Sequence, residues 1–375
     1  MADTKKFLFA ALLLLSSVSL VRAQYTTDKV VGKKHQEYLD SVKSAEYPYV
    51  LPILGKKAYQ KGFSLPYSAG LSVNFITQKS DIIIENLKVG FNNGELYDLD
   101  NIIRFNAAES RGSGLNIRPD FWLFPFLDVY GILAKSALST SIDAGLWIPV
   151  NDSTWQQVLP LSTKAEFDAT TVGLGLTPTM GVGGFFMVFD MNMTWSDVPA
   201  LEKPAFAFVF DPRIGKNFVI KNDMNVAAWV GGFRLKINTG TTGTLPMSDL
   251  FTLEDAQQKI DDGQVKVEQG YTAIDDWWNS LSSIEQKNPV NVAKYEAANK
   301  ALETAGNVLE GAEEAIGTIN NSTVQYSLDK RQKDMWNFIV GGQFQLNKHW
   351  MARGEVGFLG ARTQGLVSLQ YRFGL

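Results

Sequence analysis

Apolar and polar residues alternate along several segments of the chain, most strictly near its C-terminal end. Within residues 364–373, the apolar face carries Val367, Leu369, Tyr371 and Phe373, and the polar face carries Ser368, Gln370 and Arg372. A period of two indicates a β-strand whose two faces meet different environments. This segment therefore predicts a strand between an apolar and a polar medium.

The same alternation recurs with large aromatic residues on one face and polar or charged residues on the other. Residues 185–195, 206–210, 227–237 and 336–344 each repeat it. A soluble core rarely needs so many aromatic faces, whereas a lipid-facing wall around a polar lumen does. We therefore expect ten aromatic side chains to face lipid: Phe185, Phe189, Trp195, Phe206, Phe208, Trp229, Trp336, Phe338, Tyr371 and Phe373.

Alternating stretches of about ten residues, separated by turn signals, predict an all-β transmembrane barrel with antiparallel up-and-down strands. About twelve strands are expected, and counts of ten to fourteen also fit the pattern. The expected strands span 67–77, 81–90, 97–107, 113–124, 127–138, 164–176, 181–196, 203–213, 222–238, 335–346, 350–359 and 363–374.

The expected connections alternate between short turns and longer loops. Short turns are expected at 125–126, 177–179, 215–217 and 347–348, and longer loops at 108–112, 139–163, 197–202 and 239–334. The glycine pairs at 183–184, 231–232 and 341–342 are expected inside strands. Because outer-membrane barrels keep short turns in the periplasm and long loops outside, both termini are expected in the periplasm.

The first 23 residues predict a cleavable secretory signal. Lys5 and Lys6 precede an apolar run from Phe7 to Leu20, and the small-residue cleavage pattern Val21-Arg22-Ala23 follows. A retained N-terminal anchor is the alternative. Residues 24–65 are polar and are expected to form a periplasmic segment with a short helix over 33–44. Barrel strands one to nine are then expected within 66–239, and strands ten to twelve within 335–375.

Residues 240–334 interrupt the strand pattern between expected strands nine and ten. Within 253–319, apolar residues recur at three- and four-residue spacing in two stripes, separated by Asn288-Pro289. This spacing predicts an antiparallel helical hairpin that buries its seam against itself. Its thirteen acidic and five basic residues indicate a solvated arm. The loop assignment places this arm outside the cell.

Two adjacent tryptophans lie shortly before the expected tip of the hairpin. Trp277 and Trp278 are candidates for a partner-binding patch on the extracellular arm. The alternative is that one tryptophan covers the helical seam while the other is partly exposed.

Composition argues against several function classes. The chain has no cysteine, a net charge of −4 and two histidines, His35 and His349. An exported protein without cysteine has neither disulfides nor thiolate metal sites, and the charge does not favour nucleic-acid binding. Neither histidine is placed to serve a nucleophile outside the cell. We therefore expect no enzyme activity, no cofactor and no metal.

Charged residues on the expected inner faces are the remaining candidate site. They are Arg118, Asp120, Glu166, Asp168, Asp190, Asp211, Arg213, Arg234, Lys236, Arg353, Glu355 and Arg372. Fixed charges in a lumen select solutes electrostatically, or they pair across a narrow barrel and close it. We favour paired charges around a small or gated pore.

The hypothesis from the sequence is an outer-membrane barrel that passes or binds small solutes through a narrow charged lumen. The first alternative is a surface protein that transports nothing, whose hairpin binds an extracellular partner. A less favoured alternative is a barrel hydrolase acting on lipid. Expected partners are outer-membrane lipid and a small solute.

Several motifs resemble a poorly characterised family of exported barrel proteins. Residues 115–135 contain Pro-Phe-Leu-Asp-Val-Tyr-Gly, where the family tends to carry Asn in place of Asp128. Other similar pieces are 211–215, 229–232, 336–342 and the terminal Tyr-Arg-Phe at 371–373. The resemblance covers about half of the mature chain. It implies a barrel in the outer membrane and brings no established activity.

The last strand also resembles the signal that the outer-membrane assembly machinery recognises, although Gly374 and Leu375 extend past the usual final Phe. The resemblance thus implies this machinery as a further partner.

Overall fold

The computed structural model of the protein describes residues 46–199, 201, 203–221, 223–237, 240–247, 253–317 and 322–375, together with Glu37, Asp40, Ser41, Lys43 and Ser44. The predicted signal peptide, His35 and most of the predicted helix over 33–44 lie outside these residues.

Long antiparallel strands make up most of the described chain. They are β1 (Ala69–Phe91), β2 (Tyr97–Asp98), β3 (Ile103–Phe124), β4 (Leu127–Pro149), β5 (Trp155–Val182), β6 (Phe185–Asp197), β7 (Ala205–Lys221), β8 (Met224–Ile237), β9 (Gly240–Pro246), β10 (Thr323–Gln332), β11 (Trp336–Gln345), β12 (Trp350–Phe358) and β13 (Arg362–Phe373). The helices are α3 (Gly55–Gln60), α4 (Leu253–Ser280) and α5 (Pro289–Ile316). No helix of the described chain is long and apolar enough to span a membrane.

Ten of the described strands close into a barrel, in the order β1, β3 to β8, β11, β12 and β13. Closure comes from pairing of the first strand with the last, in a register that sets Ala69 opposite Phe373 and Ser80 opposite Arg362. β2, β9 and β10 lie outside this ring. The prediction of an antiparallel barrel is confirmed, whereas the expectation of about twelve strands is wrong.

Two strands that continue far beyond the apolar part of the barrel account for the difference. Polar residues 78–81 suggested a break, but they belong to β1 and remain paired with both β13 and β3. Residues 108–112 were expected to be a loop, but they belong to β3 and pair with β4. The predicted loop over 139–163 is likewise mostly strand, because β4 and β5 stay paired as far as Pro149 and Trp155.

The turns at the end nearest the chain termini are short. Those predicted at 125–126 and 347–348 lie between β3 and β4 and between β11 and β12. The turns predicted at 177–179 and 215–217 instead lie inside β5 and β7. Gly183 and Gly184, expected inside a strand, form the β5–β6 turn with φ of 60° and 84°. Such positive φ values at both turn residues are the reason for a glycine pair in a two-residue hairpin.

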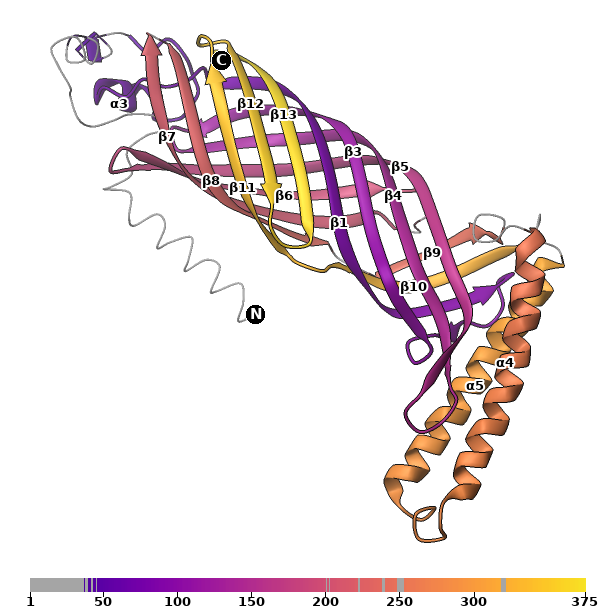
Figure 1. The fold of residues 1–375 in the computed structure, drawn as a ribbon. Coiled ribbons are helices and arrows are strands. Elements are labelled where there is room, and N and C mark those ends of the chain that lie inside the picture. The colour runs from indigo at the N-terminus through magenta and orange to yellow at the C-terminus, as the bar shows by residue number, and fades with distance from the viewer. Residues whose placement is uncertain are drawn as a thin grey trace, which may run out of the picture.

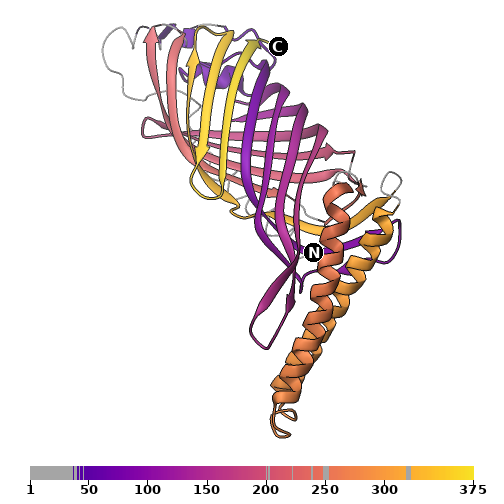
Figure 2. The same ribbon diagram turned by 45° about the vertical axis from the view of Figure 1, so that its right-hand side comes forward.

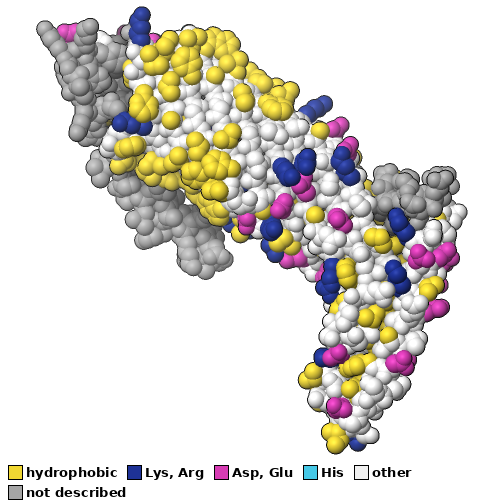
Figure 3. All heavy atoms as spheres, viewed as in Figure 1, with side chains coloured by type: hydrophobic (Ala, Val, Ile, Leu, Met, Phe, Trp, Pro, Cys, Tyr) yellow, Lys and Arg dark blue, Asp and Glu magenta, His cyan; other side chains and the backbone are white. Residues whose placement is uncertain are grey.

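The outer surface of the barrel divides into two zones. Figure 3 shows apolar side chains gathered over the end that carries the C-terminus, and charged side chains over the half nearer the helices. Exposed apolar residues of the first zone include Phe75, Leu174, Trp336 and Leu369. We call this zone the apolar belt. A closed barrel with such a belt satisfies every backbone hydrogen bond internally while it presents hydrocarbon to lipid.

Beyond the belt, the inserted segment completes the wall. β1 leaves β13 after Ser80 and pairs with β10 from Ile82 to Phe91, and β10 pairs in turn with β9. Figures 1 and 2 show the α4–α5 hairpin projecting from this end, opposite the C-terminus. The two predicted helices are therefore present, and strands that the sequence analysis missed join them to the barrel.

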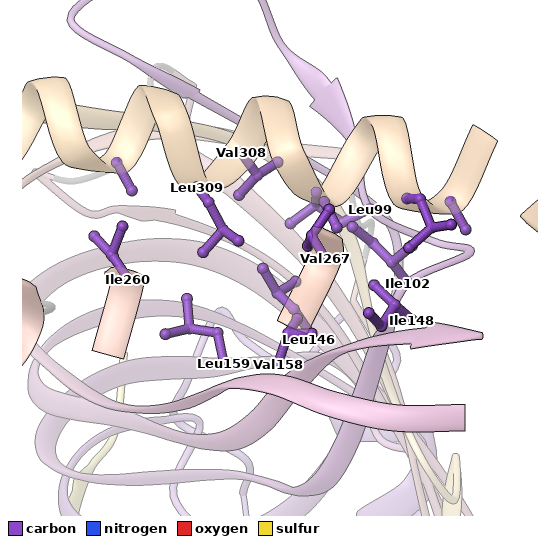
Figure 4. Close-up of a cluster of buried hydrophobic side chains, with 14 of the residues drawn as sticks. Leu99, Ile102, Leu146, Ile148, Val158, Leu159, Ile260, Val267, Val308 and Leu309 are labelled. Carbon is purple, nitrogen blue, oxygen red and sulfur yellow. The ribbon is translucent and has the colours of Figure 1, made fainter. Parts of the chain in front are cut away.

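The hairpin packs against the barrel as well as against itself. Ile260, Val267 and Leu309 of the helices share one buried cluster with Ile148 and Leu159 of the wall (Figure 4). The seam is buried between the two helices, as expected, and the same cluster extends to the barrel wall, which was not expected. Asn288 caps α5, because its side chain accepts a hydrogen bond from the backbone N–H of Val290.

Candidate functional site

Two cavities occupy the lumen. The larger, of about 700 Å³, fills the half of the barrel beyond the belt, and the smaller, of about 130 Å³, lies toward the termini. We call them the apolar chamber and the lower cavity. Both are lined by Asn74, Arg118, Asp190, Arg213 and Arg353. Charged side chains therefore form the partition between the two spaces.

Eight of the twelve predicted lumen residues point inward and gather at or near this partition. They are Arg118, Asp120, Asp190, Asp211, Arg213, Arg353, Glu355 and Arg372, which line one cavity or the other. The partition proper consists of Arg118, Asp190, Asp211, Arg213, Arg353 and Glu355, and we call this set the charged constriction.

Arg213 lies at the centre of the charged constriction and pairs with three carboxylates. Its Nε is 3.3 Å from Glu355 Oε2, and its Nη2 is 3.5 Å from Asp190 Oδ2. It also forms a close ion pair with Asp211, two residues earlier on β7. Arg353 Nη2 reaches the same Glu355 oxygen at 3.0 Å. Because these side chains come from β6, β7 and β12, the pairs join distant parts of the wall across the lumen.

Aromatic residues complete the charged constriction. Trp229 donates its indole N–H to Glu355 Oε2 at 2.9 Å, and Tyr130 donates its hydroxyl to Asp190. The Arg118 guanidinium lies 3.2 Å from the centre of the Tyr130 ring and pairs with Asp190 at 3.4 Å. Every charge here has a partner, as a buried charge requires.

Trp229 was predicted to face lipid, and this is wrong. Its side chain is buried in the lumen, where Gly341 leaves room for it: a Cβ on that glycine would lie 2.5 Å from the indole ring. Trp229 and Gly341 are register partners on β8 and β11. A tryptophan paired with a glycine on the next strand could have indicated an inward side chain, but this pairing is visible only once the strand register is known.

Four predicted lumen residues lie on the outer face instead. Glu166 and Asp168 of β5 and Lys236 of β8 are exposed, while Arg234 reaches the sulfur of Met335 outside the barrel. Their sequence neighbours Phe167 and Leu235 line the chamber instead. The reason is that the outer face of the wall is polar beyond the belt, where it meets water, and the inner face is apolar. Alternation predicts two faces but not which of them is inside.

The nine other predicted lipid-facing residues lie on outward positions of their strands, among them Phe185, Trp195, Trp336, Tyr371 and Phe373, which are exposed. Phe189, Phe206, Phe208 and Phe338 occupy outward positions on β6, β7 and β11.

The wall of the apolar chamber is built from most of the barrel strands and from the insertion. Its apolar lining includes Ile84, Leu87, Val89, Phe91, Ile103, Phe105, Ala134, Leu138, Ile142, Leu146, Leu159, Leu161, Phe167, Phe233, Leu235, Ile237, Leu245, Val308, Ala312, Val324, Tyr326 and Leu328. The α5 residues Val308 and Ala312 close it at the end nearest the hairpin. The lumen therefore offers a large apolar space that ends at a ring of paired charges.

A cation of the inserted segment, Lys330, lies within this apolar wall. Lys330 of β10 lines the chamber, and its Nζ donates a hydrogen bond to Thr140 Oγ1 of β4 at 3.1 Å. Burial lowers the pKa of Lys330 to about 8. The sequence analysis missed both residues, although Val324, Tyr326, Leu328 and Lys330 alternate with period two and mark the strand.

The remaining candidates lie away from the lumen. The His349 ring stacks on Tyr371 at 5.4 Å, and its Nδ1 lies 2.8 Å from the carbonyl oxygen of Arg372. Trp278 stacks on Tyr295 at 4.6 Å across the hairpin, and Trp277 lies beside it at 6.2 Å. Both tryptophans are half-buried, and their role in partner binding stays a prediction.

Comparison of the sequence with models of known protein families gives no match. Comparison with curated proteins gives none either. Similar solved structures include an outer membrane channel from Pseudomonas putida F1, with 9% identity and a TM-score of 0.28 over 82% of this chain and 96% of that chain. The translocator domain of autotransporter NalP from Neisseria meningitidis is another, with 10% identity and a TM-score of 0.29 over 84% of this chain and 92% of that chain.

Scores this low carry no argument, so the assignment depends on the molecule itself. A closed antiparallel barrel with an outer apolar belt is the architecture that crosses bacterial outer membranes with strands. From its strand pairing and its belt, the chain is an outer-membrane β-barrel whose lumen joins an apolar chamber to a charged constriction.

Proposed function

We propose that this barrel takes up small apolar solutes in the chamber and passes them toward the charged constriction. The observation that carries the proposal is the chamber itself, an interior space of about 700 Å³ with a mainly apolar lining. Ligand sites in proteins typically measure ~300–1,000 Å³ and combine an apolar wall with a few polar groups. The chamber matches that description.

We also infer the orientation of the barrel in the membrane. Ala69, where β1 begins, and Phe373, where β13 ends, both lie on the side of the barrel that has the short turns. Short turns favour the periplasm and long connections the outside. The chamber and the α4–α5 hairpin then lie on the outer side, where a solute arrives first, and the charged constriction controls its onward passage.

The inferred activity is binding and passage, without catalysis. His349, the histidine among the described residues, packs against Tyr371 near the termini, far along the strands from the chamber. The chamber lining supports apolar contact more than proton transfer.

A blocked chamber tests the proposal. Ala134→Trp adds an indole to the chamber lining, and Ala137→Trp adds one to the exposed outer face of the same strand. Binding of neutral 2-naphthamide to the barrel in lipid nanodiscs is measured by equilibrium dialysis, with protein-free nanodiscs as the blank. We expect Ala134→Trp to abolish binding and Ala137→Trp to leave it unchanged. Equal binding by both variants would contradict the proposal.

A second candidate function is favoured by the tip of the hairpin. Ile284 is 84% exposed and Val290 is 61% exposed there, so the tip offers apolar side chains to a partner. In that case the barrel acts as an anchor. Ile284→Ser would then weaken partner binding, whereas naphthamide binding would not depend on this residue.

A further inference from the structure

Lys330 differs from the arginines of the charged constriction because it has no acidic partner. Arg118, Arg213 and Arg353 each have a carboxylate oxygen within 3.5 Å. Among the described residues, no carboxylate lies within ion-pair distance of Lys330, whose hydrogen-bond partner is the neutral hydroxyl of Thr140. A buried cation without a counter-ion is costly, so a site of this kind favours an anion from outside the chain.

The surroundings of Lys330 are apolar and belong to the chamber. Lys330 is paired in register with Ile84 of β1, and Leu328 precedes it on the same inner face. Its side chain crosses toward β4, where Thr140 lies between Leu138 and Ile142 along the lining. An anion held here would therefore have apolar walls on both sides.

The two polar groups together provide donors for an anion. An ammonium group has three N–H donors, and Thr140 accepts one of them. Because that hydroxyl accepts through its oxygen, its own hydrogen stays available to donate. Lys330 is protonated at neutral pH even though burial lowers its pKa to about 8. The pair can thus offer two N–H donors and one O–H donor to the same anionic head.

We propose that the chamber binds an amphipathic carboxylate, a molecule with an apolar body and one carboxylate group, whose head pairs with Lys330 and Thr140. This inference rests on the proposed solute-binding function and names its substrate class. A single point charge and one hydroxyl suit a monoanionic carboxylate. A phosphate ester, with more charge and more acceptor oxygens, favours several cationic donors or a bidentate arginine.

A matched pair of ligands separates charge recognition from apolar binding. The barrel in nanodiscs of zwitterionic lipid is titrated with 2-naphthoate and with neutral 2-naphthamide, again by equilibrium dialysis against protein-free nanodiscs. We expect Lys330→Met to weaken naphthoate binding about tenfold or more, in line with the loss of a charge-assisted hydrogen bond. Naphthamide affinity should be unchanged. Lys330→Arg should retain most of the naphthoate affinity, and Thr140→Val should lose a smaller part.

The control is Lys236→Met, because Lys236 lies on an exposed outer position of β8 and lines neither cavity. If Lys330→Met leaves naphthoate binding intact while naphthamide also binds, the carboxylate inference is overturned and the solute-binding function stands. If neither ligand binds the wild-type barrel, the solute-binding function fails as well. Tighter binding of 2-naphthyl phosphate than of 2-naphthoate would overturn the choice of carboxylate. Heat-modifiable migration of each variant shows that the barrel is folded.

Discussion

Arg213 Nε and Glu355 Oε2 lie 3.3 Å apart across the lumen, although β7 and β12 are separated in the barrel wall by two other strands. Because Arg213 also pairs with Asp190 and Asp211, this contact joins three strands within the charged constriction. Ion pairs that span the lumen in this way narrow the path through it.

Removal of both partners should open the lumen. We expect Arg213→Ala combined with Glu355→Ala to raise single-channel conductance in planar bilayers several-fold, since two large side chains leave the constriction. Lys79→Ala with Glu109→Ala removes an ion pair of 2.7 Å on the outer wall and should leave conductance unchanged. Unchanged conductance in the lumen variant would show that the barrel is closed at another level.

An arginine introduced into the apolar belt should reduce folding of the barrel far more than an arginine introduced into the lumen. Leu369→Arg places a cation on a belt residue that is 52% exposed, at a cost of up to ~2–4 kcal/mol near the middle of the bilayer. Gln343→Arg places the same cation beside the lower cavity. The folded fraction, measured as the heat-modifiable band after refolding, should fall only for Leu369→Arg. Equal yields would mean that the belt does not face lipid.

Docking of the hairpin should depend on the wall residue beneath it. Ile148 is fully buried, and its side chain lies close to Gly270 of α4. Ile148→Ala should weaken the packing by ~2–5 kcal/mol through the cavity it leaves. Faster amide hydrogen exchange in α4 and α5 is the expected readout. Ile284→Ala, at the exposed tip, is the control and should change exchange little; parallel behaviour of the two variants would contradict the shared core.

The affinity for a carboxylate should fall with rising pH. Burial lowers the pKa of Lys330 to about 8, so its charge is lost between pH 7 and 9.5, and naphthoate binding should decline over that window. Burial raises the pKa of the neighbouring Tyr326, which stays neutral over this window. Lys330→Arg should bind naphthoate equally at both pH values. A decline in that variant too would assign the effect to another group.

Sidedness is testable in cells. Protease added to intact bacteria should cut within 281–288, which joins α4 to α5, and should spare residues 46–66 beside the termini. Protection of the hairpin until the outer membrane is opened would reverse the inferred orientation.

The sequence predicts the architecture well because lipid imposes a strong and repeated pattern on the belt. Phe185, Trp195 and Tyr371 alternate with neighbours on the other face because each of the three meets lipid. Both helices are predicted correctly because their apolar residues recur at three- and four-residue spacing. The strand count fails where lipid no longer acts. Residues 78–81 and 108–112 continue their strands beyond the belt, so polarity there does not mark a turn.

The site is only half predictable for a related reason. Arg118, Asp190 and Arg213 were expected in the lumen because they alternate with belt residues. Trp229 and Glu166 were assigned to the wrong side, since period two cannot distinguish an apolar interior from an apolar exterior. Lys330 was missed because it lies in β10, a strand of the inserted segment that pairs with β1, which is far away in the sequence.

β1 uses two different partners along its length, β13 up to Ser80 and β10 from Ile82 onward. Closure of the membrane ring and completion of the chamber therefore depend on two different stretches of β1. β13 closes the ring against the first stretch, and β10 completes the chamber against the second. Because Lys330 belongs to β10, the cation comes with the strand that completes the chamber and not with the ring.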